Sequence, residues 1–140
     1  FIIAIELKLF KNESDNLNKN LRKAFRSIGQ PLRYHLYGYD SSILWHVFDK
    51  EVHDDIIKSY SELIEESIKK LKLPIVYFST KILEEDKFLV FKPWESYSSY
   101  DISYLIEWLL KCAKNLRNPL LFDEKVAKRR RALKIILEIP

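Results

Sequence analysis

Residues 1–10 have the sequence Phe-Ile-Ile-Ala-Ile-Glu-Leu-Lys-Leu-Phe. The first five are all apolar and rich in β-branched side chains, a composition that predicts a strand buried on both faces. Glu6 and Lys8 interrupt this pattern, and their spacing of two places both side chains on the same face of the strand. Because a buried charge is costly unless it is paired or bound, this pair is a candidate site.

The chemistry of the pair is that of a phosphate or metal site. A carboxylate on a rigid strand suits a hard cation such as Mg²⁺, which prefers oxygen ligands. A neighbouring ammonium could orient an attacking water or neutralise the charge on a phosphate. The alternative is an ordinary ion pair at the exposed end of a strand, because the same spacing recurs at Glu85 and Lys87 in a charged loop.

A helix is predicted over residues 13–37, and it carries Gln30 and Tyr34 near its end. These two residues are four apart and therefore share one helix face. Pro31 predicts a kink near residues 27–28 or a break between two helices. A further apolar strand follows at residues 43–48. Alternatively, Tyr34 belongs to the core and Gln30 caps a turn.

A strand with E-x-K, a helix with Q-x-x-x-Y and a further strand together resemble the second half of the PD-(D/E)xK nuclease core, most closely its RecB-type branch. The resemblance covers residues 1 to about 50. It implies a restriction-endonuclease-like fold and a DNA nuclease that depends on Mg²⁺ or Mn²⁺. Glu6 and the Leu7 carbonyl would ligate the metal, and Lys8 would position water or stabilise charge. Gln30 and Tyr34 would support the site and contact the substrate strand.

The resemblance also implies an acidic metal ligand on a strand before the E-x-K strand, and no residue precedes Phe1 in this sequence. We therefore expect a fragment, a processed product or the visible part of a longer protein. Glu13 or Asp15 would be the substitutes within the sequence. The alternative function is a catalytically inactive nucleic-acid-binding module with the same fold. A third possibility is a scaffold domain, as a homo-oligomer or as a subunit of a larger assembly.

The remaining pattern predicts an α/β fold, with a mixed sheet flanked by helices and a helical C-terminal extension. A helix over residues 51–72 precedes a hairpin over residues 75–91, which would add an antiparallel edge to parallel strands. We predict two parts, a nuclease-like core at 1–92, without its N-terminal elements, and the helical extension at 93–140. Asp101 or Ser99 would cap the first helix of the extension, and Asp123 the second.

Positive charge is concentrated at both ends of the sequence. The overall composition, 47% hydrophobic and 31% charged, is typical of a globular protein. Residues 1–35 carry seven Lys or Arg against three acidic residues, and residues 123–140 carry six against three. Basic ends suit a polyanion such as DNA, although ordinary solvated helix faces have the same composition. The predicted nucleic-acid-binding residues are Lys11, Arg22, Lys23, Arg26, Arg33, Arg129, Arg130 and Arg131.

The cysteine and histidine content excludes some kinds of covalent link and metal site. Cys112 is the only cysteine, so an internal disulfide and a Cys-based zinc site are excluded, and we expect a cytoplasmic protein. The three histidines do not have metal-ligand spacing, and His46 among apolar residues is typical of a packed core position. No apolar run is long enough to span a membrane. Two glycines and no methionine suggest a thermophilic composition.

Overall fold

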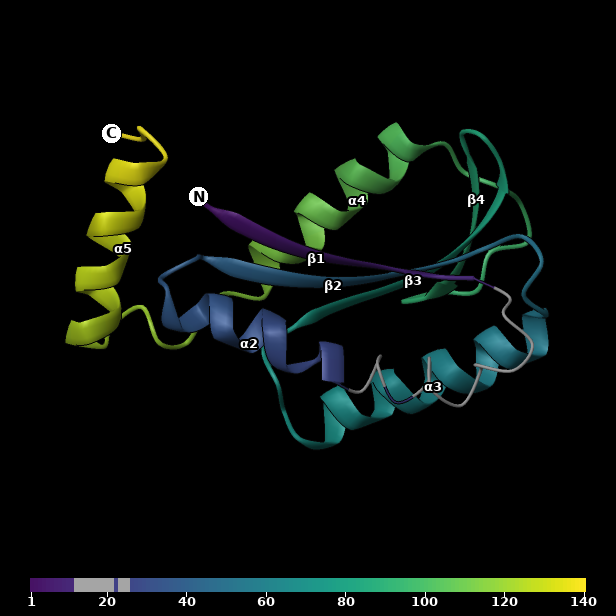
Figure 1. Cartoon of the computed structure of the whole chain (residues 1–140), viewed down its shortest axis with the longest axis horizontal. Helices are drawn as coiled ribbons and strands as arrows, with labels where there is room; N and C mark the ends of the chain where they lie inside the picture. Colours follow the sequence, from purple (N-terminus) through teal and green to yellow (C-terminus); the bar gives the residue numbers. More distant parts are fainter. Residues whose placement is uncertain (12–21, 23–25) are drawn as a thin grey trace.

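The computed structural model describes residues 1–11, 22 and 26–140, whose strands form one mixed sheet (Figure 1). The strand order is β1-β2-β3-β4; the first three strands are parallel, and β4 is antiparallel to β3. The strands are β1 (Ile3–Phe10), β2 (Ser41–Phe48), β3 (Val76–Glu84) and β4 (Lys87–Lys92). The predicted mixed α/β sheet is therefore confirmed, and so is the hairpin that adds an antiparallel edge to its parallel strands.

Helices lie on both faces of this sheet (Figure 1). They are α2 (Gly29–Leu36), α3 (Asp54–Lys70), α4 (Ile102–Asn115) and α5 (Glu124–Ile136). Helices α2 and α3 cover one face and α4 covers the other, whereas α5 stands at the end of the sheet where β1 begins. The predicted caps are present, because Asp101 accepts a hydrogen bond from the Tyr104 backbone N–H and Asp123 accepts two from the first turn of α5.

Two apolar layers hold the helices to the sheet. Leu44 and Phe48 of β2 point toward α3, whereas Ile43 and Trp45 of the same strand point toward α4. Every residue of β2 is buried because it is covered on both faces. Helix α4, which belongs to the predicted C-terminal extension, buries Leu105 and Leu109 in the same layer as β2 and β3.

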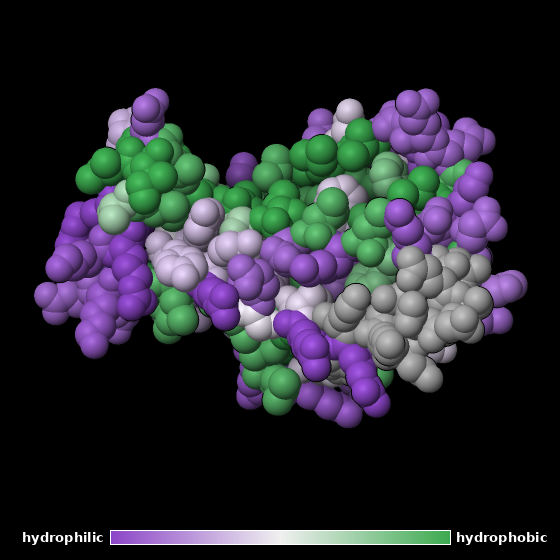
Figure 2. Space-filling view, viewed as in Figure 1, coloured by the Kyte–Doolittle hydropathy of each residue, from purple (hydrophilic) through white to green (hydrophobic). Residues whose placement is uncertain are grey.

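The prediction that β1 is buried on both faces is wrong for one face. Ile5, Leu7 and Leu9 are each about half exposed, between 45% and 55%. The reason is that β1 is an edge strand in the described sheet, while α4 packs against β2 and β3. Figure 2 shows hydrophobic residues gathered over β1 and α4, and again on α5.

The predicted helix over residues 13–37 is interrupted, as Pro31 indicates. Ile28 is a turn residue that keeps helical dihedral angles (φ -62°, ψ -34°), and α2 starts at Gly29. Pro31 then lies in the first turn of α2, where the missing N–H would be unpaired in any case. The beginning of the predicted helix lies outside the described residues. Within the part of the chain that the structure describes, none of the helices combines the length and apolarity that crossing a bilayer requires.

Candidate functional site

Glu6 and Lys8 lie on the face of β1 that is turned toward α2, next to Leu44 and His46 of β2. The Lys8 Nζ is 3.1 Å from the Glu6 Oε1, and the side chain of Glu6 is 15% exposed while that of Lys8 is 47% exposed. The other carboxylate oxygen, Oε2, accepts a hydrogen bond of 2.9 Å from the Tyr34 hydroxyl. The carboxylate is therefore held in one orientation from both sides.

Helix α2 supplies the second half of this arrangement, because Gln30 and Tyr34 are one turn apart on it. A hydrogen bond with Gln30 acts to lower the pKa of Tyr34, but burial and the Glu6 carboxylate raise it, and the net change is upward. Tyr34 therefore remains protonated at neutral pH and serves as a donor to Glu6. The Q-x-x-x-Y spacing brings both side chains to the E-x-K strand, as its helical periodicity predicts.

A pocket of about 450 Å³ opens between β1 and the helical segment at residues 26–30. It is lined by Glu6, Lys8, Leu9, Phe10, Arg26, Ser27 and Gln30. Three of the four predicted catalytic residues thus share one pocket, and Tyr34 joins them through Glu6. Arg26, predicted only as a nucleic-acid contact, places a second cation in the pocket.

A buried polar chain lies behind this pocket. The Ser27 hydroxyl is 3.0 Å from the His46 Nε2, and the His46 Nδ1 is 3.0 Å from the Tyr77 hydroxyl. Burial and the positive charge of Lys8 lower the pKa of His46 to about 3, so that the ring is neutral in the folded protein. His46 is thus packed and hydrogen-bonded, as its apolar neighbourhood in the sequence indicates.

The residues around Glu6 match the donor type that Mg²⁺ prefers, but they supply few donors. Mg²⁺ is commonly bound by one or two carboxylates, with waters and substrate phosphates completing its shell. Glu6 supplies one such carboxylate, whereas the Leu7 side chain points to the opposite face of β1, which leaves only its carbonyl as a donor. No group of three or more His, Cys, Asp or Glu residues suited to a metal occurs among residues 1–11, 22 and 26–140. Glu13 and Asp15 lie outside these residues.

The predicted nucleic-acid contacts that the structure describes lie in different parts of the fold. Arg26 lines the Glu6 pocket, and Lys11 and Arg22 are exposed. Arg33 instead lines a separate apolar pocket, which includes Pro74 and Leu120. Lys23 lies outside the described residues.

The arginines in the basic run of α5 differ in their contacts. Arg129 donates to the Leu36 carbonyl at 3.1 Å, and Arg130 donates to the Gly38 carbonyl at 2.7 Å. Arg130 also pairs with the buried Asp40 carboxylate at 3.1 Å. Arg131 is exposed.

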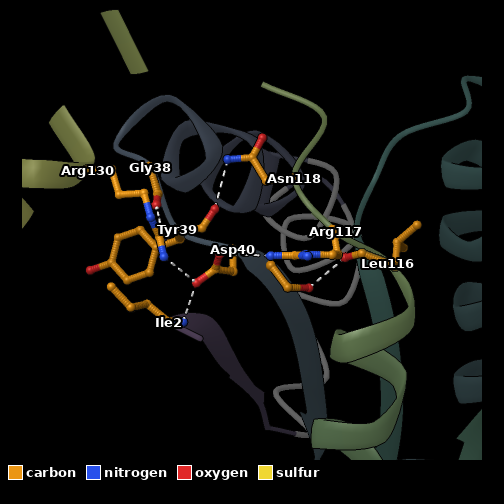
Figure 3. A network of polar contacts seen from close by, with 9 residues as sticks. Ile2, Gly38, Tyr39, Asp40, Leu116, Arg117, Asn118 and Arg130 are labelled. Carbon is orange, nitrogen blue, oxygen red and sulfur yellow. Dashed lines mark hydrogen bonds and ion pairs between the residues drawn. The ribbon is translucent and has the colours of Figure 1, made fainter. Parts of the chain in front are cut away.

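Asp40 is the centre of a polar cluster that sequence reasoning did not find (Figure 3). It is 2% exposed and accepts a hydrogen bond of 2.5 Å from the Ile2 backbone N–H. Arg130 and, at 3.5 Å, Arg117 approach the same carboxylate. Asn118 donates to the carbonyls of His35 and Tyr39, so the cluster ties α4 and α5 to the turn before β2. The only signal in the sequence is an acidic residue directly before a buried strand.

The assembled pocket combines an oriented carboxylate with two cations and an amide. Such a set can bind a phosphate through Lys8 and Arg26 and can place Glu6 near a cation or a water beside that phosphate. Comparison of the chain with protein-family models, with curated proteins and with solved structures found no match.

Proposed function

We propose that this protein is a metal-dependent DNA nuclease of the PD-(D/E)xK type, with a restriction-endonuclease-like arrangement of its mixed sheet. One observation carries the proposal. Glu6, Lys8 and Gln30, from a strand and a helix separated in sequence, line one pocket, and Tyr34 donates to Glu6 across 28 positions. An isolated surface ion pair would not need a helix that supplies two further polar side chains.

Each residue has a role in phosphodiester hydrolysis under this proposal. Lys8 and Arg26 would bind the scissile phosphate, and Lys8 would stabilise the negative charge that develops on it. Glu6 and the Leu7 carbonyl would hold Mg²⁺ or Mn²⁺, which would activate water and offset negative charge. Tyr34 would keep the carboxylate in place, and Gln30 would hold Tyr34 and contact the substrate strand.

A second candidate function is DNA binding without cleavage. It is favoured by the pairing of both Glu6 oxygens within the protein, one with Lys8 and the other with Tyr34. Glu6 is also the only carboxylate that lines the pocket among the described residues. A module of this kind would use Lys8 and Arg26 for phosphate contacts and would have no need of a metal.

The deciding experiment compares cleavage of plasmid and linear DNA, with Mg²⁺ or Mn²⁺, by the wild type and by Glu6→Gln and Lys8→Ala. Glu85→Gln and Lys87→Ala are matched controls, because they have the same spacing at the turn between β3 and β4. Circular dichroism confirms that every variant is folded.

Loss of cutting in both site variants, with cutting retained in both controls, is expected. Cutting that survives Glu6→Gln and Lys8→Ala would refute the proposed site. Absence of cutting by the wild type, together with binding that weakens as salt is added, would favour the binding module.

A further inference from the structure

A second pocket, of about 410 Å³, lies beyond Tyr34 from Glu6. It is lined by Tyr34, Tyr37, Tyr39, Arg129, Ala132, Leu133 and Ile136. The tyrosines come from α2 and the turn that follows it, and the other residues come from α5. Tyr34 is the wall between the two pockets, because its ring lines the second pocket while its hydroxyl reaches the carboxylate of the first.

The walls of this second pocket have the chemistry of a stacking site. The rings of Tyr34 and Tyr39 pack edge to face, with centroids 5.5 Å apart and planes at 64°. Tyr37 is 49% exposed, so its ring is accessible to a ligand. Arg129 contributes a cation beside these rings, and Leu133 and Ile136 contribute apolar surface.

The second pocket is held in shape by the contacts that fix α5. Arg129 donates to the Leu36 carbonyl, and Arg130 joins the Gly38 carbonyl to the Asp40 carboxylate (Figure 3). A ligand would therefore enter a preformed site and would not have to order α5 first, which lowers the cost of binding.

We propose that this pocket binds one unpaired nucleobase of the nucleic-acid strand whose phosphate lies at Glu6 and Lys8; this inference rests on the proposed function. Aromatic rings and an arginine are the groups on which single-stranded bases stack, and every base offers a flat face to them. The exposed Lys128 on the same helix adds to the positive charge that a phosphate backbone needs.

The inference names a substrate class. A base inside a duplex is already stacked on its neighbours and would have to leave the helix to enter the pocket, which costs the free energy of unstacking and unpairing. A base in a single strand, at a frayed end or in a flap enters without that cost. The pocket therefore favours cleavage of unpaired or end-frayed DNA over intact duplex.

The test uses single-stranded oligonucleotides that carry one 2-aminopurine, titrated with the protein in EDTA so that no cutting occurs. Quenching of the 2-aminopurine fluorescence reports stacking. Tyr37→Leu removes a ring from the pocket, and Ala132→Leu narrows the pocket with an aliphatic side chain from an exposed position on α5. Tyr97→Leu is the control, because Tyr97 is fully exposed and lies outside both pockets.

Either site variant should abolish the quenching and weaken binding about 5- to 150-fold, the range expected for one stacked base. Tyr97→Leu should change neither. Wild-type binding without quenching at any 2-aminopurine position, or quenching that persists in both site variants, would overturn the inference.

The two proposals fail separately. Quenching that is lost in the variants of a protein that never cuts DNA would support the base pocket and refute the nuclease. If Tyr37→Leu leaves the rate of cleavage unchanged, and single-stranded and duplex substrates are cut equally fast, the base pocket alone is refuted.

Discussion

The Tyr34 hydroxyl donates to the Glu6 carboxylate at 2.9 Å and so joins α2 to β1 at the candidate site. The other Glu6 oxygen pairs with Lys8 at 3.1 Å. Because two donors from different elements fix the carboxylate, its position depends on α2 as much as on its own strand. Tyr34 is therefore the residue through which helix packing and site geometry are coupled.

Replacing Tyr34 with Phe keeps the ring but removes the donor to Glu6. We expect a loss of about tenfold in kcat/KM for DNA cleavage and a loss of about 1 kcal/mol in the free energy of unfolding, the usual net value of one hydrogen bond. Cleavage kinetics and chemical denaturation measure the two effects. Tyr97→Phe is the control, since this side chain is fully exposed. Unchanged cleavage by Tyr34→Phe would show that the bond has no part in activity.

The candidate site could be predicted from two local periodicities. A period of two places Glu6 and Lys8 on one strand face, and a spacing of four places Gln30 and Tyr34 on one helix face. A parallel strand-helix-strand connection packs its helix back onto the sheet, which brings the two pairs together. These relationships are short-range or topological, and so one sequence is enough to reveal them.

Local sequence patterns do not predict contacts between residues that are far apart in the chain. The apolar run of β1 has the same composition whether α4 covers it or not, and so the exposure of Leu7 was not predicted. Arg129 and Arg130 look like solvated cations in a basic run, yet they bind carbonyls more than ninety positions away. Their role depends on where the turn at Gly38 and Asp40 lies in space, which local patterns do not encode.

Replacing Gly38 with Ala should weaken the packing of α5 against the turn before β2. Gly38 has φ +91°, and a Cβ at this position would lie 2.6 Å from the Arg130 Cβ and 2.8 Å from its Cα. We expect a stability loss of about 1–3 kcal/mol and faster tryptic cleavage at the basic run of α5. Gly29→Ala is the matched control, because nothing lies within 4 Å of its added Cβ, and Ala in a helix should leave stability unchanged or raise it. Equal behaviour of the two variants would contradict this account of the α5 docking.

Arg130→Met and Arg131→Met should separate structural from exposed positions in the basic run. Arg130 is half-buried on Asp40, and its removal leaves a buried carboxylate with fewer partners, at a cost of about 3 kcal/mol. Arg131 is exposed, and its removal should change stability by less than about 0.5 kcal/mol. If Arg131 contacts DNA, the Arg131→Met variant should bind DNA more weakly, and its affinity should depend less on salt concentration. Equal losses of stability in thermal denaturation would refute this division.

His46 should make the protein less stable in acid. Burial and Lys8 lower its folded pKa to about 3 from 6.5, so the unfolded chain takes up the proton first as the pH falls. The stabilising contribution is complete above pH 6.5 and is lost between there and about pH 3, by up to about 1.4 kcal/mol per pH unit.

The His46→Gln variant removes the group that takes up this proton and keeps a polar side chain near Ser27. Its stability should fall less steeply than that of the wild type between pH 6 and 4, as measured by urea denaturation at each pH. His35 is also buried with a lowered pKa, but it is present in both proteins and cancels in the comparison. Parallel profiles for the two proteins would mean that His46 is already protonated in the folded state.

Leu44→Ala and Leu7→Ala test the unequal burial of two neighbouring strands. Leu44 is fully buried beneath α3, and its truncation should cost about 2–5 kcal/mol of unfolding free energy. Leu7 is 55% exposed on the other face of β1, and its truncation should cost less than about 1 kcal/mol because little apolar area returns to water. Urea denaturation of the two variants at the same pH measures both costs. A large loss for Leu7→Ala would mean that another surface covers this face of β1 in solution, and the loss should then depend on protein concentration if that surface belongs to a second copy.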